Sequence, residues 1–231
     1  MKHEPQTLLI DADDTLWENN IYFEAAFEEF VEFLEHSKLS AAEVRGILDE
    51  IELANSKVHG YGSLNFAKNL QECYAKLAER EVLEEDLERV KGFALRILER
   101  PVELIEGVAE TLDELAGRHE LILFTKGHPD EQRMKIDASG VGRWFADTVV
   151  VKEKNQAAYE GLVSGRGLEK RRTWMIGNSP KSDVNPALEA GLNAVFVPHE
   201  RTWTLERQEL RAPGPGRLVV VERFGDLRGL F

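Results

Sequence analysis

The sequence predicts an α/β protein in which a parallel sheet is flanked by helices and interrupted early in the chain by a helical insertion. Three observations lead to this fold class. Short apolar runs recur along the chain with helix-like stretches between them, and from Leu121 onward the starts of successive runs are about 20 to 27 residues apart. The first two runs, in contrast, are separated by about 110 residues, far more than one crossover needs.

Each apolar run has the composition of a strand that is buried on both faces. None of the runs alternates apolar with polar residues, and continuous apolar runs of this length are typical of strands in a parallel sheet. They are TLLI (7–10), LILFT (121–125), TVVV (148–151), WMIG (174–177) and AVFV (194–197). A sixth run, LVVV (218–221), follows the Pro/Gly-rich segment APGPG and is expected to form an edge strand.

Helical segments fill the intervals between these runs. One helix between successive strands is the arrangement that a parallel sheet requires. We expect core helices over Gly107–Ala116, Asp130–Ala138, Gln156–Leu162 and Pro180–Ala190, with Pro180 in a first helical turn.

The long gap contains four stripes of apolar residues at helical spacing. They run from Phe23 to Leu34, from Val44 to Ile51, from Phe66 to Leu77 and from Leu87 to Ile97. Ser40 and Glu43 form a capping-box pattern ahead of the second stripe. The sequence therefore predicts a Rossmann-like core of residues 1–16 and 100–231, with a helical cap inserted at 17–99.

Composition narrows the function classes. The 231 residues are 42% hydrophobic and 31% charged, which is typical of a folded globular chain and excludes collagen-like or largely disordered proteins. The formal net charge of −13 argues against nucleic-acid or membrane partners. The single cysteine, Cys73, cannot form an intramolecular disulfide, and no apolar span of about 20 residues is present. We therefore expect a cytoplasmic monomer or homodimer.

The first predicted strand ends in a loop of carboxylates, Asp11-Ala12-Asp13-Asp14-Thr15. Open parallel sheets bind ligands at the carboxyl ends of their strands. Two carboxylates two residues apart can divide the chemistry. Asp11 can attack phosphorus, while Asp13 protonates the leaving oxygen and later deprotonates water. A helix cap or a solvated turn is the structural alternative for this loop taken alone.

Three further segments follow predicted strands in a fixed order. Thr125 ends LILFT, Lys154 lies in VVVKEKNQ, and GNSPKSD (177–183) follows WMI. Together with DADDTLW and LFTKG, these segments resemble the four motifs of the haloacid dehalogenase-like hydrolase superfamily. Members with an acid at the position of Asp13 are usually phosphatases, whereas haloacid dehalogenases lack that acid. The resemblance therefore implies phosphoryl transfer.

Phosphoryl transfer needs positioning groups and positive charge around the phosphate. The candidate donors are the Thr125 hydroxyl and the backbone N–H groups of Lys126 and Gly127. Lys154 would supply a fixed positive charge to Asp11 and to the phosphate. Lys152 remains an alternative to Lys154, because VVVKEK leaves the register of the loop open.

A metal ion would relieve the repulsion between converging carboxylates, and Mg²⁺ suits an all-oxygen site. The resemblance implies that the Asp11 side chain, the Asp13 backbone carbonyl and residue 178 are its ligands. Asp183 would bind through water or orient Lys154. The family often has Asp where this chain has Asn178, so a neutral amide oxygen replaces a charged ligand here.

A polar, glycine-containing loop, Lys57–Ser63, separates two stripes of the insertion. In helical-cap members of the family, the corresponding region folds over the active site and selects the leaving group. We expect Tyr61 to stack on a ring of the substrate and His59 to donate to a polar group. A flexible surface turn is the alternative.

These expectations combine into a Mg²⁺-dependent phosphatase that forms an aspartyl phosphate on Asp11. Its substrate would be a small phosphomonoester such as a nucleotide, flavin mononucleotide, a sugar phosphate or a similar metabolite. Two other classes stay open. A phosphonate hydrolase or phosphomutase would share the core, and a noncatalytic phosphate-binding module would be favoured if Mg²⁺ failed to bind at Asn178.

Overall fold

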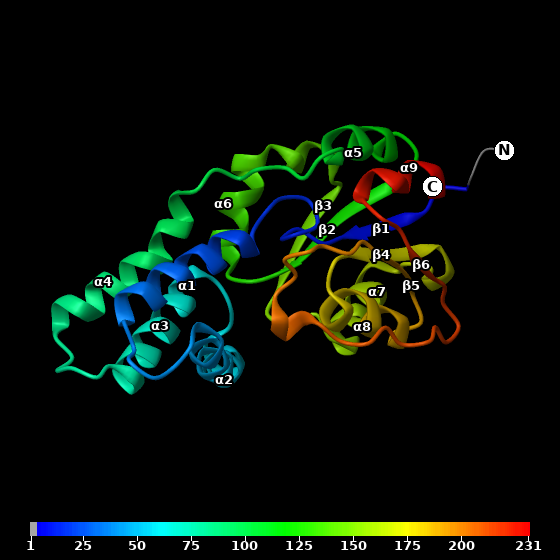
Figure 1. Ribbon diagram of the computed structural model, residues 1–231. Coiled ribbons are helices and arrows are strands. Elements are labelled where there is room, and N and C mark those ends of the chain that lie inside the picture. The colour runs from blue at the N-terminus through cyan, green and yellow to red at the C-terminus, as the bar shows by residue number, and fades with distance from the viewer. Residues whose placement is uncertain (1–3) are drawn as a thin grey trace. The chain divides into compact units, whose positions relative to one another are not determined.

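The computed structural model describes residues 4–231 and has a six-stranded parallel sheet at its centre (Figure 1). The strand order is β3-β2-β1-β4-β5-β6, which places β6 at the edge, as expected. The strands are β1 (Thr7–Ile10), β2 (Glu120–Lys126), β3 (Asp147–Val151), β4 (Thr173–Gly177), β5 (Asn193–Phe196) and β6 (Leu218–Val220). The predicted α/β, Rossmann-like fold class is confirmed, and each predicted strand is present with its ends shifted by at most one residue.

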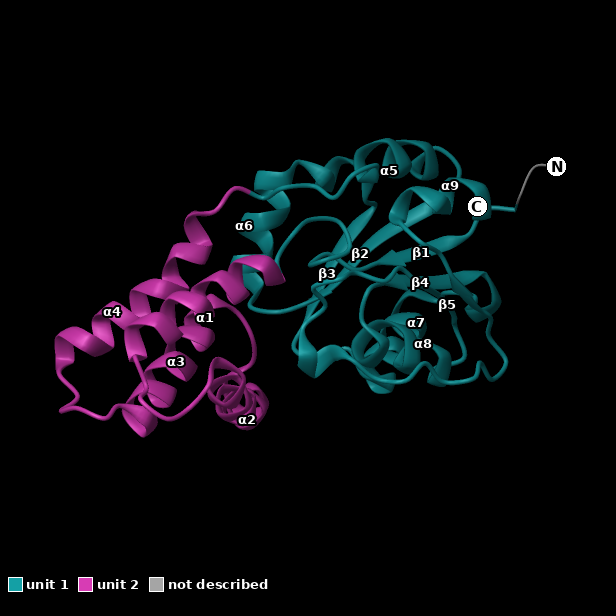
Figure 2. Cartoon of the chain, viewed as in Figure 1, with its two compact units in different colours: residues 1–19, 102–231 teal, residues 20–101 magenta. Residues whose placement is uncertain are grey.

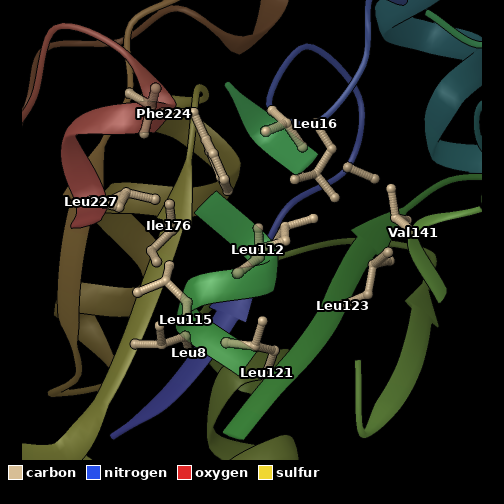
Figure 3. Close-up of a cluster of buried hydrophobic side chains, with 14 of the residues drawn as sticks. Leu8, Leu16, Leu112, Leu115, Leu121, Leu123, Val141, Ile176, Phe224 and Leu227 are labelled. Carbon is tan, nitrogen blue, oxygen red and sulfur yellow. The ribbon is translucent and has the colours of Figure 1, made fainter. Parts of the chain in front are cut away.

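One face of the sheet packs against α5 (Val108–Ala116), α6 (Pro129–Ser139) and the C-terminal helix α9 (Leu227–Leu230). Alternate residues of a strand point to opposite faces, so Leu8 and Ile10 of β1 lie on this side together. Figure 3 shows Leu112 and Leu115 of α5 beside Leu8 in this cluster. The cluster is fully apolar, and it fixes the strands beneath the loops that carry the motifs.

The opposite face is covered by α7 (Gln156–Arg166) and α8 (Asn185–Glu189), which Figure 1 shows on the other side of the sheet from α5. Leu9, Phe124 and Met175 contribute the strand side chains of this cluster, and Tyr159 contributes from α7. Burial on both faces explains why the strands read as continuous apolar runs.

One predicted core helix is wrong in its first half. Residues 180–190 were expected to form a single α-helix, but Pro180–Val184 forms a π-helical turn (η4), and only Asn185–Glu189 is α-helical. The 3₁₀ turns of the chain are Arg96–Glu99 (η1), Val141–Trp144 (η2), Lys170–Arg172 (η3), Thr204–Glu206 (η5) and Phe224–Asp226 (η6).

The chain divides into two compact units, Asn20–Pro101 and the remainder (Figure 2). The smaller unit contains α1 (Asn20–Leu34), α2 (Ala41–His59), α3 (Ser63–Leu77) and α4 (Glu84–Leu95) around a shared apolar core. It begins three residues later than the expected 17–99, because Trp17 pairs with Leu104 of the sheet-containing unit. The capping box of Ser40 and Glu43 is present at the start of α2. Within residues 4–231, every helix is too short or too polar to cross a bilayer.

Candidate functional site

The carboxyl ends of β1 and β4 meet at the centre of the sheet. The two strands are neighbours in space although they are far apart in sequence, which makes this point the topological switch of the sheet. The Asp11 N–H donates to the Ile176 carbonyl at 2.9 Å. The loop that begins at Asp11 and the loop that begins at Asn178 therefore leave the sheet side by side.

Lys154 joins the first and fourth motif segments. Its ammonium group donates to an oxygen of Asp11 and, at 2.7 Å, to Oδ1 of Asp183. All three residues are buried, whereas Lys152 is exposed, so the structure resolves the register of the loop in favour of Lys154 at Asp11. Burial opposes the charge on Lys154, but the two carboxylates outweigh it and raise the pKa of the ammonium group.

The carboxyl group of Asp183 is buried close to the negative charge of Asp11 and to the positive charge of Lys154. Burial, and next the charge of Asp11, raise its pKa above the usual range, although Lys154 opposes this shift. The π-helical turn places the carboxylate here, since Ser179 N–H donates to its Oδ2 at 2.9 Å. A Cβ on Gly177 would lie 2.2 Å from that same oxygen, so this position requires glycine.

Asn178 is held through both ends of its amide. Its Nδ2 donates to the Thr202 hydroxyl at 3.0 Å, and its Oδ1 lies 3.3 Å from the Thr15 hydroxyl. Thr15 is also 3.1 Å from Oδ2 of Asp11, and its single proton serves one of these two acceptors at a time. An amide oxygen and a carboxylate oxygen are thus kept near one another, both facing the same hydroxyl.

This donor set fits a hard divalent cation. Asp11, Asn178 and Asp183 offer only oxygen atoms, and two buried carboxylates share one ammonium group, which leaves an excess of negative charge. Mg²⁺ prefers such oxygen ligands and retains several of its waters. The Asp13 backbone carbonyl remains the other expected contributor.

The Asp13 side chain does not contact Lys154. It accepts hydrogen bonds from Trp17, Gln132 and Lys135, at 2.7, 2.8 and 2.6 Å. Burial raises the pKa of this carboxyl group, but the three donors, Lys135 foremost, outweigh burial and bring the pKa below its usual value. Asp11 and Asp13 therefore have separate partners although they share one loop.

The second motif segment lies at the end of β2. Thr125 is buried, with 1% of its surface exposed. The Gly127 N–H donates to the Val151 carbonyl at 3.2 Å, so this amide could reach a phosphate only after that bond broke, which revises its expected role as a donor. The Lys126 side chain turns instead to Glu206 and Ser182, at 2.6 and 3.1 Å.

The two expected specificity residues lie in the helical unit. His59 is the last residue of α2 and is exposed, and Tyr61 follows in the short loop before α3. The Asn65 side chain donates to the backbone carbonyls of both residues. Their contact with a substrate stays a prediction.

Several residues around the site were missed in the sequence. Glu206 is buried, accepts from Lys126 and from Ser179 at 2.6 Å each, and has a lowered pKa because these donors outweigh its burial. Neither Glu206 nor Thr202 lies in a motif, and nothing in the sequence marks their long-range contacts. Gln132 and Lys135 did carry a signal, since polar residues three apart on a helix share one face.

A second polar group occurs on the first loop. Asp14, Glu18 and His199 each place one ligand atom within 4.8 Å of the others. His199 Nε2 lies 3.3 Å from Glu18, and its Nδ1 accepts from the Arg201 N–H at 3.3 Å. The imidazole of His199 is thus in contact with Glu18 through one nitrogen and with a backbone N–H through the other.

Comparison with known proteins identifies a family model and a curated relative that match most of the chain. A model of the haloacid dehalogenase-like hydrolases matches residues 5–191. Human N-acylneuraminate-9-phosphatase is 24% identical over 203 residues, which cover 82% of this chain and 80% of that protein.

Solved structures with the same fold cover nearly the whole chain. A haloacid dehalogenase-like hydrolase from Xanthomonas campestris has a TM-score of 0.82 and 29% identity, and the match covers 98% of this chain and 90% of that one. The putative hydrolase YfnB from Bacillus subtilis, solved with magnesium bound, has a TM-score of 0.68 and 17% identity, with 99% of each chain covered. Haloacid dehalogenases also share the fold.

Proposed function

The chain belongs to the haloacid dehalogenase-like hydrolase family, and from this premise we propose that it is a Mg²⁺-dependent phosphatase of small phosphomonoesters. The observation that carries the proposal is the presence of two carboxylates on the first loop with different partners. Asp11 contacts the buried Lys154, whereas Asp13 accepts hydrogen bonds from Trp17, Gln132 and Lys135. A nucleophile and a separate acid/base need such a division.

The proposed reaction proceeds in two steps. A carboxylate oxygen of Asp11 attacks phosphorus, and the bond from phosphorus to the ester oxygen breaks to give an aspartyl phosphate. In its protonated form Asp13 donates a proton to the departing oxygen, which leaves as an alcohol. Asp13 then accepts a proton from the water that attacks phosphorus, so that inorganic phosphate is released and Asp11 is restored.

The surrounding residues would orient the phosphoryl group and balance its charge. Lys154 orients Asp11 through its hydrogen bond, and the Thr125 hydroxyl would donate to a phosphoryl oxygen. When bound, Mg²⁺ would supply further positive charge at the phosphoryl oxygens. Asp11, the Asp13 carbonyl and Asn178 would hold it, with Asp183 acting through water or through Lys154.

The proposed substrate class rests on the helical insertion, which the family resemblance associates with small substrates, and on the human relative. A nucleotide, flavin mononucleotide or a sugar phosphate fits, and the N-acylneuraminate 9-phosphate named for that relative is a specific candidate. Haloacid dehalogenases share the fold, so fold alone does not choose between the two chemistries. The acid at position 13 favours phosphate esters.

A substrate screen tests this proposal. The purified protein with Mg²⁺ would be incubated with these esters and with p-nitrophenyl phosphate, and released inorganic phosphate would be measured. The Asp11→Asn variant and an EDTA-treated sample are the matched controls. We expect phosphate release by the untreated wild type and by neither control. Phosphate release from none of these esters would contradict the proposed phosphatase, and failure of the same protein to bind Mg²⁺ would favour a noncatalytic phosphate-binding module.

A further inference from the structure

Hydrogen-bond donors surround the Asp13 carboxylate. Oδ1 accepts from Trp17 Nε1 at 2.7 Å and from Lys135 Nζ at 2.6 Å, and Oδ2 accepts from Gln132 Nε2 at 2.8 Å. The side chains of Asp13 and Lys135 are 23% and 13% exposed. Such charge-assisted bonds are short and directional, so this side chain has a defined place.

The donors on α6 are built into the chain directly after the second motif segment. The helix begins at Pro129, two residues after Gly127, and presents Gln132 and Lys135 one turn apart on one face. Lys135 also donates to Asn19 Oδ1 at 3.1 Å, and the Asn19 N–H donates to Asp14. The helix that follows β2 is thereby connected by hydrogen bonds to the loop that carries Asp13.

Gly127 makes the approach of Gln132 possible. A Cβ at this glycine, whose φ is +152°, would lie 2.7 Å from Gln132 Nε2. The same nitrogen lies 3.3 Å from the Lys126 carbonyl, so the amide is held with its donor end toward Asp13. Rotating the amide by half a turn would place Gln132 Oε1 against the oxygen atoms of Asp13 and of the Lys126 carbonyl.

This arrangement leaves one polar atom unsatisfied. Gln132 is 3% exposed, and its Oε1 is buried and accepts no hydrogen bond within the described part of the chain. Burying an unpaired acceptor costs free energy. The donor end of the Gln132 amide satisfies Asp13 and the Lys126 carbonyl, and its oxygen is left without a partner within the described residues.

We propose that Gln132 and Lys135 are positioning residues that hold Asp13 as the acid/base of the reaction. The inference rests on the proposed phosphatase function. Both residues act through Asp13, so their loss affects the step in which Asp13 protonates the leaving oxygen. Esters with poor leaving groups depend on that proton, whereas p-nitrophenolate leaves with little help.

The test compares leaving groups in matched variants. Lys135→Met and Gln132→Leu each remove donors, Lys135→Arg retains them, and Arg133→Met removes an exposed charge from the same helix. The value of kcat/KM would be measured with p-nitrophenyl phosphate and with phenyl phosphate. We expect the two donor-removing variants to lose on the order of tenfold more with phenyl phosphate. Lys135→Arg should recover much of this, and Arg133→Met should leave the ratio unchanged.

A double variant separates positioning from general damage. If Lys135 acts through Asp13, adding Lys135→Met to Asp13→Asn changes the ratio between the two esters no further. Equal losses with both esters in Lys135→Met and in Gln132→Leu would overturn the proposal, and so would a further change of the ratio in the Asp13→Asn background.

Crystal structures keep this inference distinct from the proposed function. If the wild type hydrolyses neither ester, the phosphatase function and the acid/base role of Asp13 are both contradicted. The crystal structures still show whether Gln132 and Lys135 fix the position of the Asp13 side chain. We expect the Asp13 side chain to occupy one position in the wild type and in Arg133→Met, and to leave it in the Gln132→Leu/Lys135→Met protein. An unchanged Asp13 in that protein would overturn the positioning role whatever the activity.

Discussion

The side-chain nitrogen of Asn178 donates a hydrogen bond to the hydroxyl of Thr202 across 3.0 Å. That hydroxyl donates its own proton to the His199 carbonyl, also at 3.0 Å, and can therefore only accept from Asn178. The direction of these two bonds keeps Asn178 Oδ1 on the side of Thr15 and Asp11. An oxygen, and not a nitrogen, is thus presented where the family pattern puts a metal ligand.

Replacing Thr202 by Val should weaken Mg²⁺ binding, because the amide loses the partner that fixes its orientation. Loss of such outer partners typically costs 10–100-fold in metal affinity, and we expect about tenfold here. Titration calorimetry with Mg²⁺ measures this directly, and Thr202→Ser is the control that retains the hydroxyl. Unchanged affinity in Thr202→Val would contradict this role.

The Asn178→Asp variant should bind Mg²⁺ more tightly, because it adds a charged oxygen ligand. In the metal-free protein the new carboxylate would face the Thr202 oxygen, so the hydroxyl must turn its proton away from His199. We therefore expect a lower melting temperature in EDTA together with a higher Mg²⁺ affinity by calorimetry. Weaker Mg²⁺ binding would indicate that the neutral amide suits the coordination better.

Lys154→Met should destabilise the metal-free protein, since it leaves the buried carboxylates of Asp11 and Asp183 without their shared ammonium group. Removal of one partner from a buried ion pair costs about 3 kcal/mol or more. Urea unfolding with EDTA would report the loss, and added Mg²⁺ should recover part of it. If Lys154→Met were as stable as the control Lys152→Met, which changes an exposed lysine, the ammonium group of Lys154 would not be needed to balance the two carboxylates.

Substitutions in the cap loop should alter specificity more than chemistry. Tyr61→Ala and His59→Ala are expected to change the ranking of metabolite esters in the substrate screen. Activity on p-nitrophenyl phosphate should fall only modestly, because that ester offers little for the loop to recognise. If the ranking is the same in both variants, the loop is a surface turn without a role in substrate choice.

Local pattern was enough to predict the sheet and the helices of the insertion. The strands are buried on both faces, so their apolar runs were unambiguous, and Ser40 with Glu43 marked the start of α2 correctly. The order of the motifs predicted that Asp11, Lys154 and Asp183 lie close together. The hydrogen bonds of Lys154 to both carboxylates agree with that prediction.

The features that were missed are one local change of helix type and several contacts distant in sequence. Residues 180–184 read as an ordinary helix start, yet the Val184 N–H donates to the Ser179 carbonyl at 3.1 Å and widens the turn. This widening occurs where the Asp183 carboxylate faces Lys154, and π-turns are often found at such sites. Glu206 and Thr202 come from the segment after β5, whose path over the fourth motif no local pattern predicts.

The central claim is that Asp11 is the nucleophile toward phosphorus, and trapping the phosphoryl group tests it most directly. Wild type and Asp11→Asn would be mixed with p-nitrophenyl phosphate and Mg²⁺, quenched in acid and analysed by peptide mass spectrometry, with circular dichroism to verify folding. The account predicts a phosphoryl group on the peptide that contains Asp11 in the wild type, and neither this adduct nor steady-state turnover in Asp11→Asn. Substantial phosphate release by a folded Asp11→Asn protein, or a phosphoryl group trapped on another residue, would contradict it.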